Sequence, residues 1–137
     1  MENDFKCTAF IITAVEVEPE SIKRYYPSWK RVIVSGDRQA YYETFFEKDG
    51  ERYRIVTAQQ SFMGMTAATV LTMKAIETFK PKYVIMSGIT AGTGDEAKQV
   101  YGDVIVPDVI WDYSTGKFVG PDETEIRFGD LGFLPRP

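Results

Sequence analysis

The stretch that decides the fold is Thr8-Ala9-Phe10-Ile11-Ile12-Thr13-Ala14, residues 8–14. It is short, apolar and rich in residues that favour strands, which is typical of a buried strand in a parallel sheet. Glu18-Pro19-Glu20 follows, and a proline between two acidic residues predicts the first turn of a helix, because the positive end of the helix dipole favours carboxylates. Pro27 ends this helix. A strand that runs into a helix in this way predicts an α/β fold.

The rest of the chain predicts a mixed β-sheet flanked by helices. Asp49-Gly50 is a strong signal for a type I′ hairpin between two strands. Small and apolar residues at helical spacing then predict a second helix. The last 27 residues predict a long loop region with at most one short strand. After the first strand and helix, the predicted elements are strands 31–34, 40–47 and 51–58, helix 63–79, and strands 82–86 and 102–108.

Composition excludes several classes of function. The chain has 137 residues, 44% of them hydrophobic, which suits one globular domain. A net charge of -4 argues against a surface that tracks nucleic-acid phosphates. No apolar run is long enough to span a bilayer, and the first residues lack the features of a signal peptide. We therefore expect a cytoplasmic protein that binds neither nucleic acid nor membranes. Its one cysteine, Cys7, lies in an apolar run and is expected in the core.

The sequence contains no histidine. This removes catalysis by Ser-His-Asp or Cys-His groups and most types of zinc site. Acid–base chemistry in these residues must use carboxylates, tyrosines, lysines or water. We expect no metal and no cofactor.

Glu16 and Glu18 follow the first predicted strand, at the end where α/β sheets bind ligands. Residues two apart in an extended loop point the same way, so one interpretation is that both carboxylates face a cleft. The alternative is an acidic first helical turn with no further role, and the local sequence alone favours that interpretation.

A loop of mostly small residues, Gly88-Ile89-Thr90-Ala91-Gly92-Thr93-Gly94, follows the predicted strand 82–86. Such residues let backbone N–H groups approach a polar ligand closely. The loop is not a Walker loop, because no Gly-Lys-Ser/Thr follows, and its glycines do not have the dinucleotide-binding spacing. A tight connection between two elements explains the same residues.

The order of these segments is more specific than any one of them. It resembles the purine/uridine phosphorylase and nucleosidase superfamily, and most of all the methylthioadenosine/S-adenosylhomocysteine nucleosidase branch. The resemblance covers residues 10–108, and residues 133–137 are also similar to nucleosidase-like proteins. The segments that carry it are the end of the first strand through Glu18, then Met63-Gly64-Met65-Thr66-Ala67-Ala68, then residues 80–92, then Gly102-Asp103-Val104-Ile105-Val106-Pro107-Asp108.

The resemblance implies cleavage of the N-glycosidic bond of a purine nucleoside or thionucleoside. In the nucleosidases, the glutamate that matches Glu18 orients and activates the attacking water. The match to the family's glycine loop implies ribose and base contacts for Gly88-Ile89-Thr90-Ala91-Gly92. Val15 and Met63 match positions that line the region of the 5′ substituent. The implied partner is therefore a small-molecule nucleoside.

The sequence departs from the family at two places in this loop. Thr90 and Ala91 are bulkier than the family's usual Ala-Gly, which would either narrow the pocket or change access to the backbone. Met86-Ser87-Gly88-Ile89 lacks the arginine before the glycine and the serine after it that hold phosphate in the bacterial phosphorylases. An anion site without its arginine loses a bidentate, charge-assisted clamp, so hydrolysis is favoured over phosphorolysis.

The family's Met-Glu pair, which grips the ribose hydroxyls, and its Ser-Asp pair, which protonates the purine, lie further along the fold than Pro137. We therefore expect residues 1–137 to be the N-terminal part of a single phosphorylase/nucleosidase-like domain, with little or no activity alone. Two other interpretations stay open. One is a degenerate domain that senses a nucleoside or nucleotide within a larger regulatory protein. The other is a structural piece that forms a homo-oligomer through an exposed sheet edge.

Overall fold

The computed structural model describes residues 4–26, 28–92, 99–108 and 110, together with the backbone of 117–118 and 126–127. The chain divides into two compact units, Met1–Ala91 and Gly92–Pro137. Most of the predicted loop region 111–137 lies outside the described residues.

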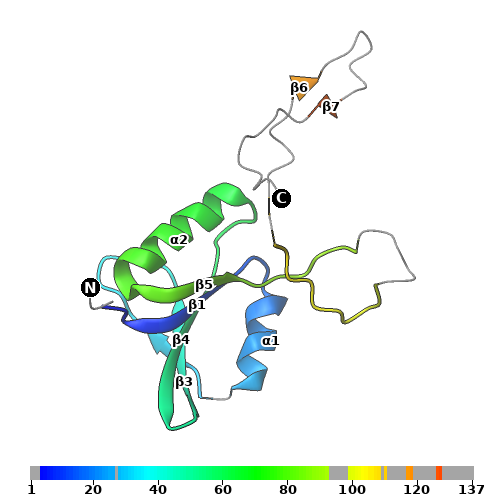
Figure 1. Ribbon diagram of the computed structural model, residues 1–137. Coiled ribbons are helices and arrows are strands. Elements are labelled where there is room, and N and C mark those ends of the chain that lie inside the picture. The colour runs from blue at the N-terminus through cyan, green and yellow to red at the C-terminus, as the bar shows by residue number, and fades with distance from the viewer. Residues whose placement is uncertain are drawn as a thin grey trace. The chain divides into compact units, whose positions relative to one another are not determined.

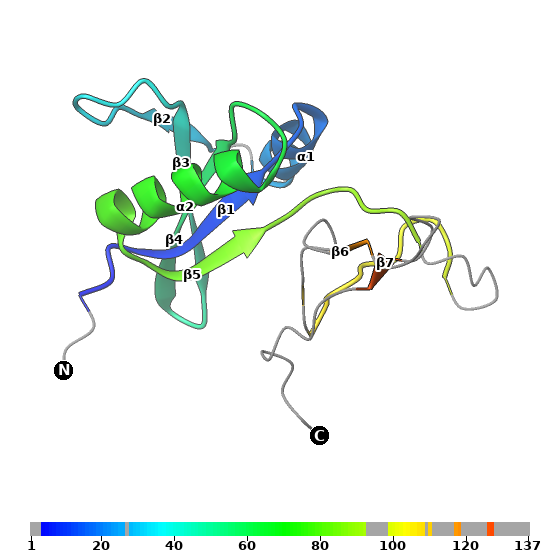
Figure 2. The same cartoon turned by 90° about the horizontal axis from the view of Figure 1, so that it is seen from above.

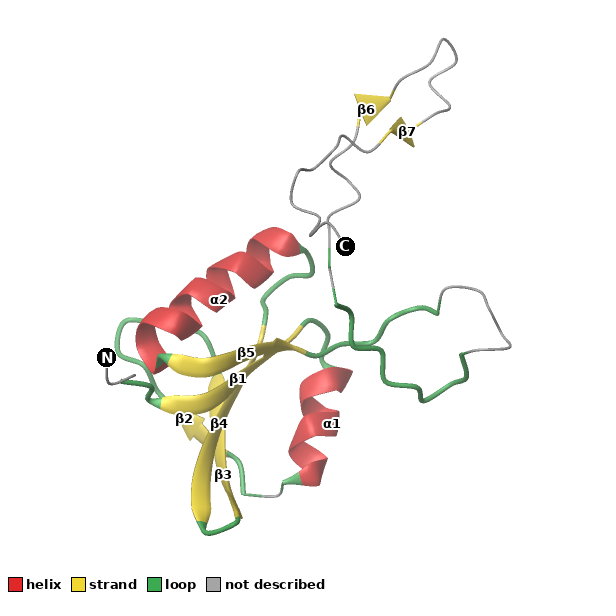
Figure 3. Cartoon of the chain, in the orientation of Figure 1, coloured by secondary structure: helices red, strands yellow, loops and turns green. Residues whose placement is uncertain are grey.

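The first unit contains a five-stranded mixed sheet with strand order β2-β3-β4-β1-β5 (Figures 1 and 3). β1 lies between β4 and β5 and runs parallel to both, whereas β2, β3 and β4 pair antiparallel. The predicted α/β class and mixed sheet are confirmed. The elements of this unit are β1 Cys7–Thr13, α1 Val17–Tyr25, β2 Lys30–Val32, β3 Tyr41–Lys48, β4 Glu51–Gln59, α2 Met65–Phe79 and β5 Pro81–Met86.

The hairpin between β3 and β4 is confirmed with the predicted turn. Asp49 and Gly50 have φ angles of 55° and 78°, and a type I′ turn needs positive φ at both central residues. Pairing runs without interruption from Lys48 opposite Glu51 to Tyr42 opposite Thr57. The turn therefore determines the register of both strands.

Helices α1 and α2 lie on opposite faces of the sheet (Figure 1). Figure 2, turned by 90°, shows α2 extending along β1 and β5. Gly64 precedes α2 with a φ of 112°, a conformation that glycine adopts without strain. Pro19 is the buried residue of α1, in the first turn as predicted. Among the described residues, no helix is both long and apolar enough to cross a membrane.

The core lies between α2 and the sheet, and three aromatic rings connect the elements around it. Phe10 of β1 lies 6.1 Å from Tyr41 of β3 and 5.7 Å from Phe79 of α2, measured between ring centroids. The rings of Tyr41 and Phe79 are 5.0 Å apart. The expected core position of Cys7 is confirmed. The cluster consists of Cys7, Phe10, Ile12, Tyr41, Val56, Ala58, Leu71, Ala75 and Phe79.

The prediction of a strand at Gly102–Asp108 is wrong. The chain makes a turn there instead: Gly102 has a φ of 97°, and the N–H of Asp103 donates to the carbonyl of Val100. The side chains of Val104 and Val106 are 88% and 84% exposed. An apolar run forms a strand only when a neighbouring strand pairs with it, and within the described residues of the second unit none does so. That unit's one described strand pair joins β6 Lys117–Phe118 to β7 Ile126–Arg127, so the region 111–137 contains two short strands where at most one was predicted.

Candidate functional site

Glu18 lies in the first turn of α1, and its side chain turns back toward the end of β1. Its Oε2 accepts hydrogen bonds from the N–H of Ala14 at 2.7 Å and of Val15 at 3.0 Å. These two residues lie in the three-residue link between β1 and α1, so their N–H groups have no partner in either element. The carboxylate thus closes the junction between strand and helix.

The other oxygen of this carboxylate holds the turn after β5. Glu18 Oε1 accepts a hydrogen bond from the N–H of Ile89 at 2.9 Å. The two turns are neighbours because β1 and β5 are adjacent parallel strands, whose carboxyl ends meet at one edge of the sheet. The N–H of Ser87 donates to the carbonyl of Ile12 at 2.9 Å and extends this pairing beyond β5. Glu18 therefore bridges two segments that are 71 residues apart.

The hydrogen bonds lower the pKa of Glu18 below its ordinary value of 4.5. Desolvation acts to raise this pKa, but the N–H groups of Val15, Ile89 and Ala14 favour the charged form and outweigh it. Glu18 is therefore a carboxylate near neutral pH. A carboxylate offers about four lone-pair sites. Three are used here, which leaves room for a further donor such as a water molecule.

Glu16 does not share this environment. Its backbone is helical at the start of α1, so the two glutamates are not the extended pair that the sequence suggested. Side chains two apart at a helix start diverge, since each residue turns about 100° around the axis. Glu16 is exposed and lines a separate hollow of about 410 Å³ with Glu20 and Lys23 of α1. The interpretation in which both carboxylates face one cleft is wrong, whereas the acidic first helical turn that the local sequence favoured is present at Glu18 and Glu20.

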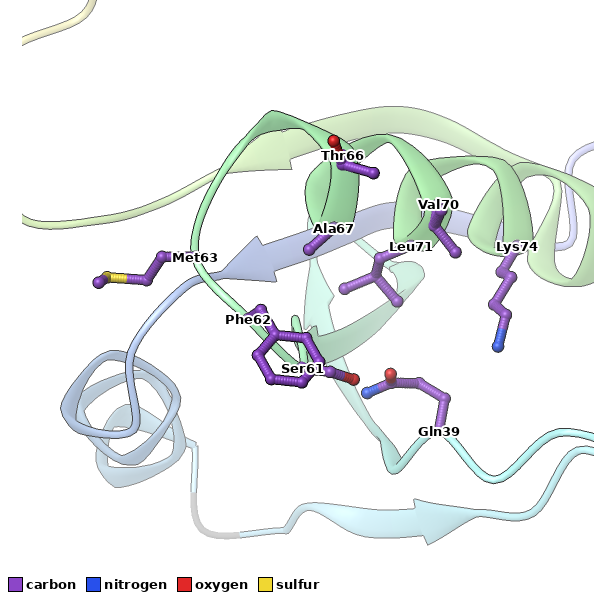
Figure 4. Close-up of a pocket in the computed structure, with 9 residues that line it drawn as sticks. All are labelled: Gln39, Ser61, Phe62, Met63, Thr66, Ala67, Val70, Leu71 and Lys74. Carbon is purple, nitrogen blue, oxygen red and sulfur yellow. The ribbon is translucent and has the colours of Figure 1, made fainter.

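Val15 and Met63 are not brought together in either of the two hollows that the structure describes. Val15 is half-buried, and its N–H is bonded to Glu18. Met63 is 74% exposed and lines a hollow of about 330 Å³ between α2 and the loop that precedes it. In Figure 4 its side chain lies at one end of this hollow, with Lys74 at the other.

The predicted glycine loop is divided between the two units. Gly88, Ile89, Thr90 and Ala91 belong to the first unit and are exposed, and Gly92 belongs to the second. The hydroxyl of Thr90 donates to the carbonyl of Ala91 at 3.4 Å, within the loop itself. Neither of the two described hollows is lined by Glu18 or by residues 88–91. The contact of this loop with the carboxylate is made through Ile89.

A second charged cluster, at Asp37, was not singled out from the sequence. The Asp37 carboxylate accepts hydrogen bonds from Lys74 Nζ at 2.8 Å, from the hydroxyl of Tyr41 at 2.8 Å and from the N–H of Gln39 at 3.0 Å. Lys74 and Gln39 also line the hollow that Met63 borders (Figure 4). Lys74 and Asp37 are far apart in sequence and on different elements, so no local pattern links them.

This cluster changes two pKa values. The hydrogen bond from Lys74 and then that from the Gln39 N–H lower the pKa of Asp37 to about 2. Burial, and then the Asp37 carboxylate, raise the pKa of the Tyr41 hydroxyl. Both groups therefore keep one protonation state near neutral pH. Within residues 4–26, 28–92, 99–108 and 110, no three carboxylate or cysteine side chains come together as metal ligands would.

Comparison with known proteins gives one family. The sequence profile of the phosphorylase superfamily matches residues 8–135. The chain is 32% identical to the uncharacterized protein y4jS of Sinorhizobium fredii over an alignment 135 residues long, which covers 96% of this chain and 30% of that protein.

Two solved structures are similar over part of the chain. One is a 5′-methylthioadenosine/S-adenosylhomocysteine nucleosidase of Campylobacter jejuni, with 18% identity and a TM-score of 0.47 over 61% of this chain and 33% of that one. The other is the nucleosidase of Neisseria meningitidis in complex with methylthio-immucillin-A, with 31% identity and a TM-score of 0.46 over 58% and 32% of the two chains. The chain thus spans about a third of the length of each of these relatives.

Proposed function

This chain belongs to the phosphorylase superfamily, and from that premise we propose that the protein hydrolyses the N-glycosidic bond of a purine nucleoside or thionucleoside. Glu18 is proposed to bind and activate the attacking water. The observation that carries the proposal is the ionised carboxylate at the shared carboxyl ends of β1 and β5, hydrogen-bonded to the Gly88–Ile89 turn. This edge is where parallel α/β sheets bind ligands.

The chemistry explains why a carboxylate is needed at this place. Breaking the bond between the ribose and the base builds positive charge on the sugar, as in the hydrolysis of glycosides. A fixed negative charge stabilises that transition state, and its free acceptor position orients a water molecule toward the sugar. The lowered pKa of Glu18 keeps the carboxylate ionised near neutral pH, so it is ready to accept the proton that the attacking water releases. A water molecule that attacks a cationic sugar becomes more acidic, so the weakly basic Glu18 carboxylate is sufficient to remove its proton.

Two observations favour water over phosphate as the acceptor. The N–H groups of Ala14, Val15 and Ile89 already donate to Glu18, so they are not available to the oxygens of a phosphate ion. A second anion at the same place would meet the charge of the carboxylate. The sequence Met86-Ser87-Gly88-Ile89 also carries no arginine to offset that charge. Both observations support hydrolysis.

The substrate contacts are assigned by resemblance. We assign the ribose and base to the loop Gly88-Ile89-Thr90-Ala91-Gly92, and the 5′ substituent to the neighbourhood of Val15 and Met63. The groups that would hold the ribose hydroxyls and protonate the base are assigned to parts of the protein other than residues 1–137.

The test is release of free base from methylthioadenosine and from adenosine by the whole protein. Glu18→Gln is nearly isosteric but carries no charge. Its amide has only one oxygen, so it cannot accept hydrogen bonds at both ends as the carboxylate does. We expect it to lower kcat by about 10²–10⁴-fold, the usual contribution of a positioned acid–base group.

Glu16→Gln is the matched control, because Glu16 is two residues away, carries the same charge and lines another hollow. It should keep kcat within about threefold of the wild type, as surface substitutions usually do. Equal rates for the wild type and Glu18→Gln would reject the assignment of Glu18.

The rival proposal is a domain that binds a nucleoside without cleaving it. It is favoured by one specific observation: the carboxylate is bonded to three backbone N–H groups, and neither described hollow includes it. Calorimetric titration of the whole protein with adenosine separates the two proposals. Binding with no free base released supports the sensor, whereas turnover supports the hydrolase.

A further inference from the structure

We infer that Gly88 is a positioning residue for Glu18: the absence of a side chain at position 88 lets the carboxylate reach the N–H of Ile89. This role differs from the substrate contact that the family resemblance implies for Gly88. Its importance for catalysis rests on the proposed function, but the contact itself does not.

The space beside Gly88 is filled by one carboxylate. A Cβ atom built on Gly88 would lie 3.1 Å from Glu18 Oε1, 3.7 Å from its Cδ and 3.9 Å from its Oε2. The three nearest heavy atoms thus all belong to Glu18. A contact of 3.1 Å between carbon and oxygen is closer than van der Waals packing normally allows, so a methyl group at this place would push the carboxylate away.

The backbone gives no other reason for a glycine at this position. Four other described glycines have positive φ angles, and this backbone conformation is the reason for a glycine at each of them. A Cβ atom added to any of the four would have no other atom within 4 Å beyond its chain neighbours. Gly88 shows the opposite combination: its φ lies outside that range, and the space beside it is occupied. A glycine is therefore needed at position 88 because of the Glu18 side chain beside it, and not because of the backbone conformation of the turn. The four glycines with positive φ are Gly36, Gly50, Gly64 and Gly102.

The carboxylate can move away from the added methyl only by lengthening or losing one of its hydrogen bonds. Its Oε2 is bonded to the junction before α1 at 2.7 and 3.0 Å, which holds that end of the group in place. The atom nearest the added methyl is Oε1, the same atom that accepts from Ile89. The first bond to be lost on substitution is therefore the one between Glu18 and Ile89. Without it, the carboxylate no longer has a fixed orientation toward the turn after β5.

The first experiment is an NMR pH titration of the protein and its Gly88→Ala variant, following the Glu18 side-chain carboxyl carbon and the Ile89 amide proton. In the wild type both signals should titrate with one midpoint, below the ordinary pKa of a glutamate. In Gly88→Ala we expect the Glu18 midpoint to rise toward the ordinary value and the Ile89 amide to stop following it.

Ser87→Ala is the matched control, because it changes the preceding exposed residue without adding volume next to Glu18. It should leave both titrations unchanged. An unchanged Glu18 midpoint in Gly88→Ala would overturn the inference.

A second experiment removes the neighbour instead of adding the methyl. In the wild type, Gly88→Ala should raise the equilibrium constant for unfolding by on the order of tenfold, the net effect of losing one hydrogen bond to a charged group. In a Glu18→Ala background the methyl has room, so the same change should not raise the unfolding constant and should lower it by up to about fivefold, because alanine has less freedom than glycine in the unfolded chain. If Gly88→Ala fails to fold in the wild-type background but folds in the Glu18→Ala background, the inference is also supported. Equal effects in both backgrounds refute it.

Neither experiment uses a substrate. Full activity of Glu18→Gln would therefore reject the proposed function and leave the role of Gly88 standing. Unchanged titrations in Gly88→Ala would reject the positioning role and leave the proposed function standing.

Discussion

Asp37 joins three separate parts of the chain through one side chain. Its partners are Lys74 on α2, the hydroxyl of Tyr41 on β3, and the N–H of Gln39 in the loop before β3. Lys74 and Asp37 form an ion pair of 2.8 Å in which the carboxylate side chain is 15% exposed. An ion pair that also has two neutral donors is stronger than an isolated surface pair, because each bond holds the others in place.

The depressed pKa of Asp37 predicts loss of stability in acid. A group whose pKa is lower in the folded than in the unfolded state stabilises the fold above its unfolded pKa, and this contribution disappears as the pH falls through the folded pKa. For Asp37 the window lies between 3.8, the ordinary value, and about 2. Allowing for solvent screening, the contribution is about 1–2 kcal/mol at pH 7. Asp37→Asn should therefore lower the free energy of unfolding by about this amount at pH 7.

Urea unfolding measured between pH 2 and pH 7 checks this expectation. The difference between the wild type and Asp37→Asn should become smaller as the pH falls through the window. Glu77→Gln, at an exposed position on α2, is the control and should follow the wild type at each pH. A difference that does not depend on pH would mean that Asp37 acts through packing and not through its charge.

At the scale of the elements, α2 ends with a strained residue. Lys80 has a φ of 40° and a ψ of 59°, the left-handed conformation, and its N–H donates to the carbonyl of Ile76 at 3.1 Å. This is a common way to end a helix, but glycine is the residue that adopts it without cost. The Lys80 side chain contributes one exposed ion pair, to Asp4 at 3.3 Å. Exposed pairs of this kind contribute little to stability.

Lys80→Gly should therefore raise the free energy of unfolding by about 0.5–1 kcal/mol, since the gain from relieved strain exceeds the entropy that glycine adds to the unfolded chain. Thermal unfolding followed by circular dichroism measures this change. Lys80→Ala removes the same ion pair but keeps the strain, so it should not be more stable than the wild type. A similar rise in both variants would show that the lysine side chain, and not the backbone, is unfavourable.

At the scale of the molecule, the first unit depends on one small core. Phe79, the last residue of α2, is 3% exposed and contacts the rings of both Phe10 and Tyr41. It therefore connects the helix to β1 and β3 together. Truncation here removes an aromatic side chain from the centre of a core that contains only a few large residues.

Phe79→Ala is expected to lower the free energy of unfolding by about 3–5 kcal/mol, the usual range for such a truncation. Urea unfolding at neutral pH measures the effect. Phe62→Ala removes the same side chain at a position that is 79% exposed and should change the stability by less than about 0.5 kcal/mol. Comparable losses at both positions would mean that Phe62 is covered in solution.

Much of the fold could be predicted from neighbouring residues. The strand at residues 8–14, the helix that begins around Pro19 and the turn at Asp49-Gly50 each depend on local backbone preferences, and the structure has all three. Those preferences act between residues a few positions apart, so a short stretch of sequence is enough to predict each of these three elements. The local pattern did not distinguish Glu18 from Glu16 as a candidate site residue. The family resemblance selected Glu18.

The failures have a common physical cause. The apolar run Gly102–Asp108 has strand-forming residues, but a strand also needs a partner, and pairing is a property of the tertiary structure. The cluster of Asp37 and Lys74 could not be predicted from the sequence for the same reason, because the two residues come together only when α2 packs on the sheet. The interpretation in which the two glutamates point together assumed an extended backbone through Glu18, but α1 begins at Val17, so Glu18 already lies in the helix.

The sequence by itself determined the α/β class, the order of strands and helices up to β5, and the presence of a carboxylate after the first strand. Tertiary structure decided what that carboxylate touches: β5 pairs beside β1, which brings the N–H of Ile89 to Glu18 and places Gly88 against its oxygen atoms. The physical reason is distance along the chain. Hydrogen bonds between residues 71 positions apart form only after the sheet has aligned its strands, and no local preference encodes that alignment.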